Sequence, residues 1–264
     1  MQSLTVTVVQ ADLAWHDIKR NLELFSSTID GLNQKTDLIV MPEMFTTGFT
    51  MDAAAHAETM RGSAVMQMAK WAKSRNAAVC GSLIIDVKGQ HFNRFVFVRP
   101  DGGVEHYDKR HRFRLAGEVE HYSAGDQQKI IEWRGWRLCP MVCYDLRFPV
   151  WSRNRPDLDY DLLLYVANWP SRRHLAWQTL LRARAIENLS YVAGVNRSGT
   201  DGNNLPYSGG SAIVDYLGQD LADLGDREGL ASVTLDRAAL EKFREKFPFH
   251  IDADTFSILP ESTS

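Results

Sequence analysis

The sequence has 264 residues, of which 44% are hydrophobic and 24% charged, a composition ordinary for a globular protein. The formal net charge of −3 gives no general attraction to nucleic acid or anionic membranes, and no apolar run approaches the length of a membrane span. No linker-like stretch divides the chain, and its first residues lack the features of a signal peptide. We therefore expect one domain over residues 1–264 in a soluble, cytoplasmic protein.

Apolar runs predict the strands, and apolar positions at helical spacing predict the helices between them. In chain order we expect a strand over residues 4–9, a helix over 18–32, a strand over 37–41, a helix over 63–75, strands over 78–85, 93–98, 136–142 and 162–166, a helix over about 172–188, strands over 191–195, 211–214 and 231–235, and a last helix over 237–246. Strands alternating with helices favour an α/β layered fold. A hairpin turn at Asp101-Gly102-Gly103 adds antiparallel pairing, so the sheets should be mixed.

Three of the predicted apolar strands end abruptly in a polar residue. These residues are Glu43, Cys143 and Asn168. Because ligand sites in α/β sheets gather at the carboxyl ends of strands, we expect a carboxylate, a thiol and an amide in one crevice.

Cys143 is the cysteine best placed for chemistry. It ends a predicted strand just before a turn into Pro149, where helix N–H groups would favour the thiolate. The alternative is a small buried apolar residue, which is the expected role of Cys80 and Cys139 inside their apolar runs. Cys139 and Cys143 would lie about 13 Å apart along one strand, too far for a disulfide, so a reducing compartment fits best.

Glu43 and Lys109 each allow a functional and an ordinary interpretation. A carboxylate after an apolar strand is costly unless paired or exposed, so Glu43 is either a general base for the thiol or an exposed loop residue. Lys109 lies in a basic run over residues 107–114 that could be a solvated face, but a lysine beside a thiol lowers the thiol pKa and can stabilise an oxyanion. The histidines and glutamates of residues 105–121 lack metal-ligand spacing, so we expect no metal site.

Three segments resemble, in order and spacing, the catalytic blocks of the nitrilase superfamily: LIVMPEMF, YDKRHRF and MVCYDLRFP. The likeness extends over nearly the whole chain, through VVQADLAW, HYSAGD, VANWP, LLRARAIEN, VNRSGTDG and YSGGSAIVDYLG. The resemblance implies a four-layer αββα sandwich that pairs across a helical face into a homodimer or a higher homo-oligomer. It also implies a catalytic triad of Glu43, Lys109 and Cys143 that needs no cofactor.

The superfamily carries a second glutamate, which positions the lysine. Its spacing from Gly125 assigns that role to Glu118, with Glu120 as a rival two residues away. The segments MPEMFTTGF, CYDLRFP and ANWP look most like the bacterial omega-amidase branch. This likeness implies a hydrolase of linear amides that cleaves the terminal amide of substrates such as 2-oxoglutaramate through a cysteine thioester and releases ammonia. The alternatives are a superfamily amidase for deaminated glutathione or N-carbamoyl substrates, and a catalytically silent scaffold.

An omega-amide of this kind keeps a carboxylate at its far end, so its pocket should contain a cation. Arg172 and Arg173 are the candidates, because arginine pairs with carboxylates in a bidentate manner, although both could instead cap or solvate the helix start. The other expected substrate contacts are Phe45, Tyr144, Asn168 and Trp169. The loops over residues 46–52 and 112–123 are candidates to cover the pocket.

Overall fold

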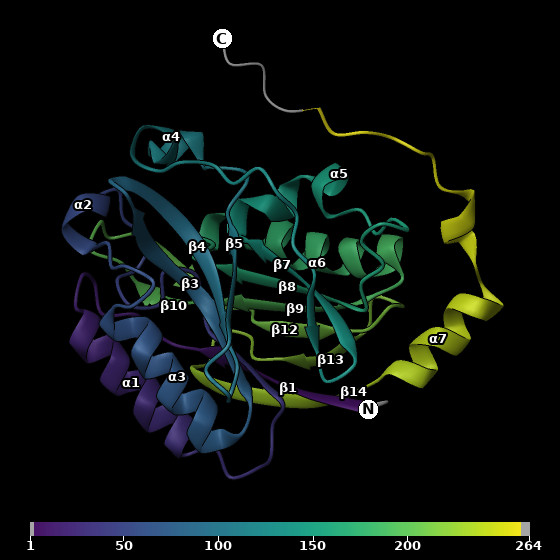
Figure 1. Cartoon of the computed structure of the whole chain (residues 1–264), viewed down its shortest axis with the longest axis horizontal. Coiled ribbons are helices and arrows are strands. Elements are labelled where there is room, and N and C mark those ends of the chain that lie inside the picture. Colours follow the sequence, from purple (N-terminus) through teal and green to yellow (C-terminus); the bar gives the residue numbers. More distant parts are fainter. Residues whose placement is uncertain (1–2, 260–264) are drawn as a thin grey trace.

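Two six-stranded β-sheets packed face to face form the centre of the protein (Figure 1). The computed structural model describes residues 3–259. The first sheet has the order β14-β1-β2-β3-β4-β5 and contains β1 (Ser3–Gln10), β2 (Leu38–Val40), β3 (Ala78–Val87), β4 (Gln90–Val98), β5 (Val104–Asp108) and β14 (Gly229–Asp236). The second has the order β13-β12-β9-β8-β7-β6 and contains β6 (Ile131–Trp133), β7 (Trp136–Val142), β8 (Leu162–Ala167), β9 (Tyr191–Asn196), β12 (Ala212–Val214) and β13 (Asp220–Asp223). A separate ribbon pairs β10 (Ser198–Thr200) with β11 (Pro206–Ser208).

Both sheets are mixed. Parallel pairs occupy the middle of each sheet, β1·β2·β3 in one and β7·β8·β9 in the other. Antiparallel pairs lie toward the edges, among them the predicted hairpin of β4 and β5.

Helices cover the outer face of each sheet (Figure 1). The first sheet carries α1 (Ile18–Asp30) and α3 (Ser63–Arg75), and the second carries α5 (Pro149–Ser152) and α6 (His174–Asn188). The remaining helices are α2 (Ala53–His56), α4 (Glu118–His121) and α7 (Arg237–Lys246), and 3-10 turns occur at Arg114–Ala116, Cys143–Arg147, Ser171–Arg173 and Phe249–Asp252. The four-layer αββα sandwich expected from the sequence is thus confirmed. No helix within residues 3–259 is long and apolar enough to span a membrane.

The strands of the first sheet bury alternate residues in two different apolar clusters, as the two-residue repeat of a strand requires. On β2, Leu38 and Val40 face the second sheet, whereas Ile39 packs under α1 and α3. On β4, Phe95 belongs to the inter-sheet cluster and Val96 to the helix-facing cluster. Other residues at the same alternate positions of these strands therefore also point into the space between the two sheets.

All nine predicted strands and all four predicted helices are present, with ends that differ by a few residues. Asp236 caps α7 as expected, because its side chain accepts the Ala239 N–H at 3.1 Å. The helix predicted from about residue 172 begins as a 3-10 turn and becomes α-helical at His174. The strands without a predicted range are short and lie at sheet edges or in the ribbon, and of β5 only the hairpin turn that precedes it was predicted.

Candidate active site

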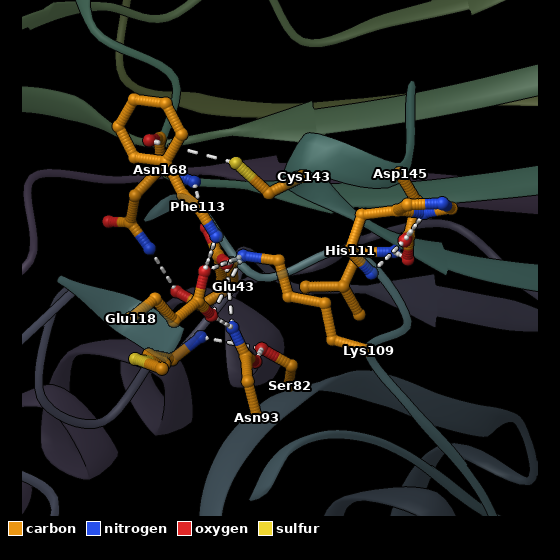
Figure 2. A network of polar contacts seen from close by, with 12 residues as sticks. Glu43, Ser82, Asn93, Lys109, His111, Phe113, Glu118, Cys143, Asp145 and Asn168 are labelled. Atoms are coloured by element: carbon orange, nitrogen blue, oxygen red, sulfur yellow. Dashed lines mark hydrogen bonds and ion pairs between the residues drawn. The ribbon is translucent and has the colours of Figure 1, made fainter. Parts of the chain in front are cut away.

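The three polar strand ends meet, and they come from both sheets. Glu43 follows β2 of the first sheet, whereas Cys143 and Asn168 follow β7 and β8 of the second. The Asn168 backbone N–H donates to Glu43 Oε2 at 2.7 Å, and Asn168 Nδ2 donates to the Glu43 carbonyl oxygen at 2.6 Å. The Cys143 thiol donates to the Asn168 carbonyl oxygen at 3.9 Å (Figure 2). A carboxylate and a thiol from opposite sheets are thereby held on either side of Asn168.

Both strand ends carry a residue with left-handed backbone. Met44, next to Glu43, has φ of 41°, and Cys143 has φ of 46°. A side chain makes this region costly, so the surrounding contacts must fix both turns. Cys143 also begins a 3-10 helix, where the first N–H groups, including that of Tyr144, have no partner inside the helix.

Lys109 lies between two carboxylates. Its Nζ donates to Glu43 Oε1 at 3.0 Å and to Glu118 Oε1 and Oε2 at 2.9 and 2.8 Å (Figure 2). All three side chains are at most 1% exposed. Burial alone would lower the pKa of Lys109, but Glu118, Glu43 and Cys143 raise it above its ordinary value, so the ammonium is held charged.

Glu118 is the glutamate in contact with the lysine, whereas Glu120 is exposed to solvent. Glu118 opens the short helix α4, and its carboxylate also accepts the Phe113 N–H. Burial raises the pKa of Glu118, Lys109 opposes that shift, and the neighbouring Glu43 adds to it. Two carboxylates beside one ammonium therefore form a compact cluster that readily holds a proton.

The environment of Cys143 does not favour the thiolate, contrary to the expectation from its position. Although the residue borders a cavity, withdrawal from bulk water raises the pKa of the Cys143 thiol well above its ordinary value. Glu43 raises it further, and Lys109 opposes both effects. The helix that follows β7 is a single 3-10 turn of five residues, too short to supply the expected stabilisation by helix N–H groups. The raised pKa means that Cys143 keeps its proton at rest.

A second polar network ties the Lys109 loop to the Cys143 turn (Figure 2). Asp145 is fully buried, and its Oδ1 accepts the backbone N–H of His111 at 2.9 Å and contacts His111 Nδ1 at 2.8 Å. Its Oδ2 accepts the Val142 N–H at 3.0 Å and the Tyr107 hydroxyl at 2.8 Å. One carboxylate therefore joins the strand before Cys143 to residues on both sides of Lys109.

Cys143 borders a cavity of about 590 Å³. Its wall contains the predicted contacts Tyr144, Asn168, Trp169, Arg172 and Arg173, together with side chains of the two predicted covering loops, including Phe49, Met51, Phe113 and Leu115. Phe45 does not line it. The Phe45 ring packs instead against Phe25 and Trp71 in the cluster under α1 and α3, which also contains Ile39 and Met41. Phe49 occupies the cavity wall.

Three arginines line the cavity, one more than expected. Arg173 lies 5.0 Å over the Phe113 ring, and Arg147 lies 4.8 Å over the Trp169 ring, whereas Arg172 is largely exposed. Burial lowers the pKa of Arg173, and the neighbouring Arg172 lowers it further. No carboxylate within residues 3–259 pairs with any of these three guanidinium groups. The cavity wall also contains Asp52 and Asp201, but neither forms an ion pair with these arginines, and Asp201 accepts the Tyr207 hydroxyl at 2.9 Å.

Sequence reasoning missed Asn93, Ser82, Asp145 and Arg147. Asn93 Nδ2 donates to Glu43 Oε1 at 2.7 Å, and the Ser82 hydroxyl donates to Asn93 Oδ1 at 2.8 Å. Both residues occupy alternate positions of apolar strands that face the second sheet, where apolar side chains are expected. A polar residue at such a position is the sequence signal that could have identified this pair. Asp145 and Arg147 lie within the Cys143 segment, and their charge next to a buried strand was the available signal.

Residues 5–245 match the carbon-nitrogen hydrolase family. The omega-amidase YafV of Yersinia enterocolitica is 48% identical over 263 residues, which cover 98% of this chain and 100% of that protein. A 2-oxoglutaramate amidase of Bacillus subtilis is 30% identical over 94% of this chain and 96% of its own length. Among solved structures, a CN-hydrolase superfamily protein of Xanthomonas campestris with an arsenic adduct in its active site has a TM-score of 0.95 at 45% identity, covering 98% of this chain and 100% of that one.

Proposed function

Because this chain belongs to the carbon-nitrogen hydrolase family, within the nitrilase superfamily, we propose that it hydrolyses the terminal amide of dicarboxylic acid omega-amides such as 2-oxoglutaramate. The observation that carries the proposal is a thiol, a carboxylate and a lysine in mutual reach beside a cavity with unpaired arginines. The relatives named as an omega-amidase and as a 2-oxoglutaramate amidase support the substrate class.

The reaction begins with proton transfer from Cys143 to Glu43. The raised pKa of Cys143 means that the thiol is neutral at rest, so it must lose its proton as it attacks the amide carbonyl carbon. Glu43 is the carboxylate beside it and serves as the base. A carbon–sulfur bond forms, and the carbonyl electron pair moves to oxygen.

The oxyanion that results is stabilised by the Tyr144 backbone N–H and by Lys109. The Tyr144 N–H is available because it lies in the first turn of the 3-10 helix. Lys109 contributes mainly as a nearby positive charge, since its hydrogens already contact Glu43 and Glu118. A donor of this type contributes on the order of 3 kcal/mol to a transition state. Glu118 positions the lysine.

Collapse of the tetrahedral intermediate breaks the carbon–nitrogen bond. Protonated Glu43 delivers its proton to the departing ammonia and leaves a thioester on Cys143. Glu43 then takes a proton from the attacking water, and breakdown of the second tetrahedral intermediate releases the carboxylic acid and returns the proton to sulfur. Glu43 therefore accepts a proton twice, from the thiol and from water, and donates one twice, to ammonia and to sulfur. Apart from substrate and water, the scheme uses only groups of this chain.

The substrate carboxylate binds Arg173 and Arg147. Their guanidinium groups rest on the faces of Phe113 and Trp169, which hold them in place and favour a positive charge there. Arg172 is more exposed and therefore contributes less, because water screens its charge.

Ammonia release from 2-oxoglutaramate tests the function, compared with nitriles, N-carbamoyl amino acids and a neutral amide of equal chain length. Loss of a charge-assisted bond should lower kcat/KM for 2-oxoglutaramate about 10- to 100-fold in Arg173→Met and Arg147→Met. The neutral amide should be nearly unaffected, and Arg172→Met is the matched control with a small effect. Turnover of the nitriles or carbamoyl compounds without turnover of omega-amides would exclude the assignment.

Labelling with a small electrophile separates an enzyme from a silent scaffold. Cys143 should react much faster than Cys80 and Cys139, because it borders the cavity whereas both others are fully buried. Cys143→Ala should abolish ammonia release and retain the fold. Equally slow labelling of all three cysteines would support the scaffold.

Residues 1–264 are proposed to form a single domain of a cytoplasmic homodimer or higher homo-oligomer. The outer helical face supports pairing, since Val150, Leu175 and Ile186 are 54, 77 and 47% exposed on α5 and α6. Leu175 and Ile186 are 11 residues apart, which places them on one side of the helix. Light scattering tests the assembly: Leu175→Glu should weaken it, and a monomeric parent protein would exclude it.

A further inference from the structure

Asn93 contacts all three charged residues of the cluster, although it carries no charge itself. Its backbone carbonyl oxygen accepts the Lys109 N–H at 3.0 Å. Its side-chain Nδ2 donates to Glu43 Oε1 at 2.7 Å and to Glu118 Oε1 at 3.3 Å. The residue is 1% exposed, so water does not compete for these hydrogen bonds.

The orientation of the Asn93 amide is fixed by a directional chain of hydrogen bonds. The Met44 backbone N–H donates to Ser82 Oγ at 2.8 Å. The Ser82 hydroxyl proton is therefore free to point to Asn93 Oδ1, 2.8 Å away. With Oδ1 engaged in this way, Nδ2 faces the two carboxylates and donates to both (Figure 2). This series of hydrogen bonds begins at Met44, the left-handed residue after Glu43. It therefore links the backbone of the Glu43 turn to the Glu43 carboxylate.

The two oxygens of Glu43 differ in how many donors they receive. Oε1 accepts both from Lys109 and from Asn93, which fills the two lone-pair positions of a carboxylate oxygen. Oε2 accepts from the Asn168 backbone N–H and keeps one position open. Asn168 also receives the Cys143 thiol on its carbonyl oxygen, so this residue joins Oε2, the oxygen with an open position, to the thiol.

We propose that Asn93 is a positioning residue for catalysis, which occupies Glu43 Oε1 so that Oε2 takes the proton of the Cys143 thiol. The proton moves from sulfur to Oε2 and from Oε2 to the departing amine, and Asn93 neither gains nor loses one. A neutral donor between Glu43 and Glu118 also keeps the two carboxyl groups from sharing that proton, as closely spaced carboxyls otherwise do. This inference rests on the proposed roles of Glu43 and Cys143, and it does not depend on which amide is hydrolysed.

Asn93→Asp tests the inference with a side chain of nearly the same shape. An oxygen then faces the two carboxylates in place of the amide nitrogen, and the extra negative charge favours proton uptake. We expect kcat to fall about 10- to 100-fold with KM changed less than about threefold. The acidic limb of the pH–rate profile should move up by about one pH unit. Alkylation of Cys143 by iodoacetamide at pH 7 should slow in parallel. Because this last readout needs no amide substrate, a wrong substrate assignment would not affect it.

Asn188→Asp is the matched control, since Asn188 is buried and hydrogen-bonded on α6, away from the cluster. It should change thermal stability without moving the pH profile. If Asn93→Asp does not fold, Ser82→Ala decides the question. It removes the lock on the amide and should shift the profile in the same direction with a loss of roughly 3- to 10-fold in kcat. Ser190→Ala, another fully buried serine, is its control. Unchanged kcat, acidic limb and alkylation rate in Asn93→Asp, or in Ser82→Ala if only that variant folds, would overturn the inference.

Discussion

Asp145→Asn tests how firmly the Lys109 loop is tied to the Cys143 turn. The carboxylate accepts four contacts, two on each oxygen, and each oxygen receives one backbone N–H. An asparagine has only one acceptor oxygen, so its amino group must face either His111 or Val142. A side-chain partner can adapt to that change, because the imidazole and the Tyr107 hydroxyl can also accept a hydrogen. A backbone N–H cannot, and it is left without an acceptor in either orientation.

The expected loss of stability follows from these contacts. A buried N–H without a partner costs about 1–3 kcal/mol. The remaining hydrogen bonds lose their ionic component, which adds about 1 kcal/mol. The total of about 3 kcal/mol corresponds to a fall in Tm of roughly 6–12 °C for a protein of this size. Turnover should fall as well, because the loop that carries Lys109 is no longer fixed to the turn that carries Cys143.

Scanning calorimetry measures the change, with Asp157→Asn as the matched control. Asp157 forms an exposed ion pair with Arg155, so its replacement should cost less than about 1 kcal/mol. A Tm for Asp145→Asn within 2 °C of the control, which is about the least shift that 1 kcal/mol produces, would contradict the expected loss of stability. That result would mean that the buried network rearranges without loss.

Three further outcomes are expected. Because Glu43 raises the pKa of Cys143, Glu43→Gln should move the pH dependence of Cys143 alkylation to lower pH. Hydrolysis should fall by at least about 100-fold, since the proposed base is lost. A shift of the alkylation profile to higher pH would contradict this expectation. Lys109→Met removes the group that lowers the pKa of Glu118, so that pKa rises further. The variant then keeps its stability at low pH, where Glu118 is protonated, and loses about 3–5 kcal/mol as the pH rises through the pKa of Glu118. Denaturant unfolding at pH 5 and at pH 8 measures this loss. In Gly125→Ala the new Cβ would lie 2.1 Å from a backbone carbonyl oxygen, and Gly125 also donates its N–H to the Lys109 carbonyl. Its Tm and turnover should both fall, and an unchanged Tm would exclude the clash.

The layers could be predicted because they depend on local patterns. Strands such as β3 and β8 are continuous apolar runs, and such runs predict buried strands directly. The short strands β5 and β13 could not be found in this way, since few of their residues are apolar and buried, although each pairs with the strand just before it in a local hairpin.

The candidate site could be predicted in part. Glu43, Lys109 and Cys143 lie in motifs whose order and spacing are visible in the sequence. Asn93 was missed because its partners are 25 and 50 residues away and meet it only when β4 lies beside them. Phe45 was misplaced for a different reason. It lies in the helix-side cluster with Ile39 and Met41, but β2 ends at Val40, so the alternation of the strand could not be extended to Phe45 from the sequence alone.

The same cluster explains how the neutral thiol that we propose as the nucleophile can react beside a buried ion pair. Transfer of the thiol proton to Glu43 leaves the net charge of Glu43, Glu118, Lys109 and Cys143 unchanged and moves one negative charge from oxygen to sulfur. Lys109 remains beside both groups, so little charge separation opposes the step even though the low-dielectric surroundings strengthen every interaction. A high thiol pKa is thus compatible with catalysis, because the base and the counter-ion are already in place and solvent need not reorganise.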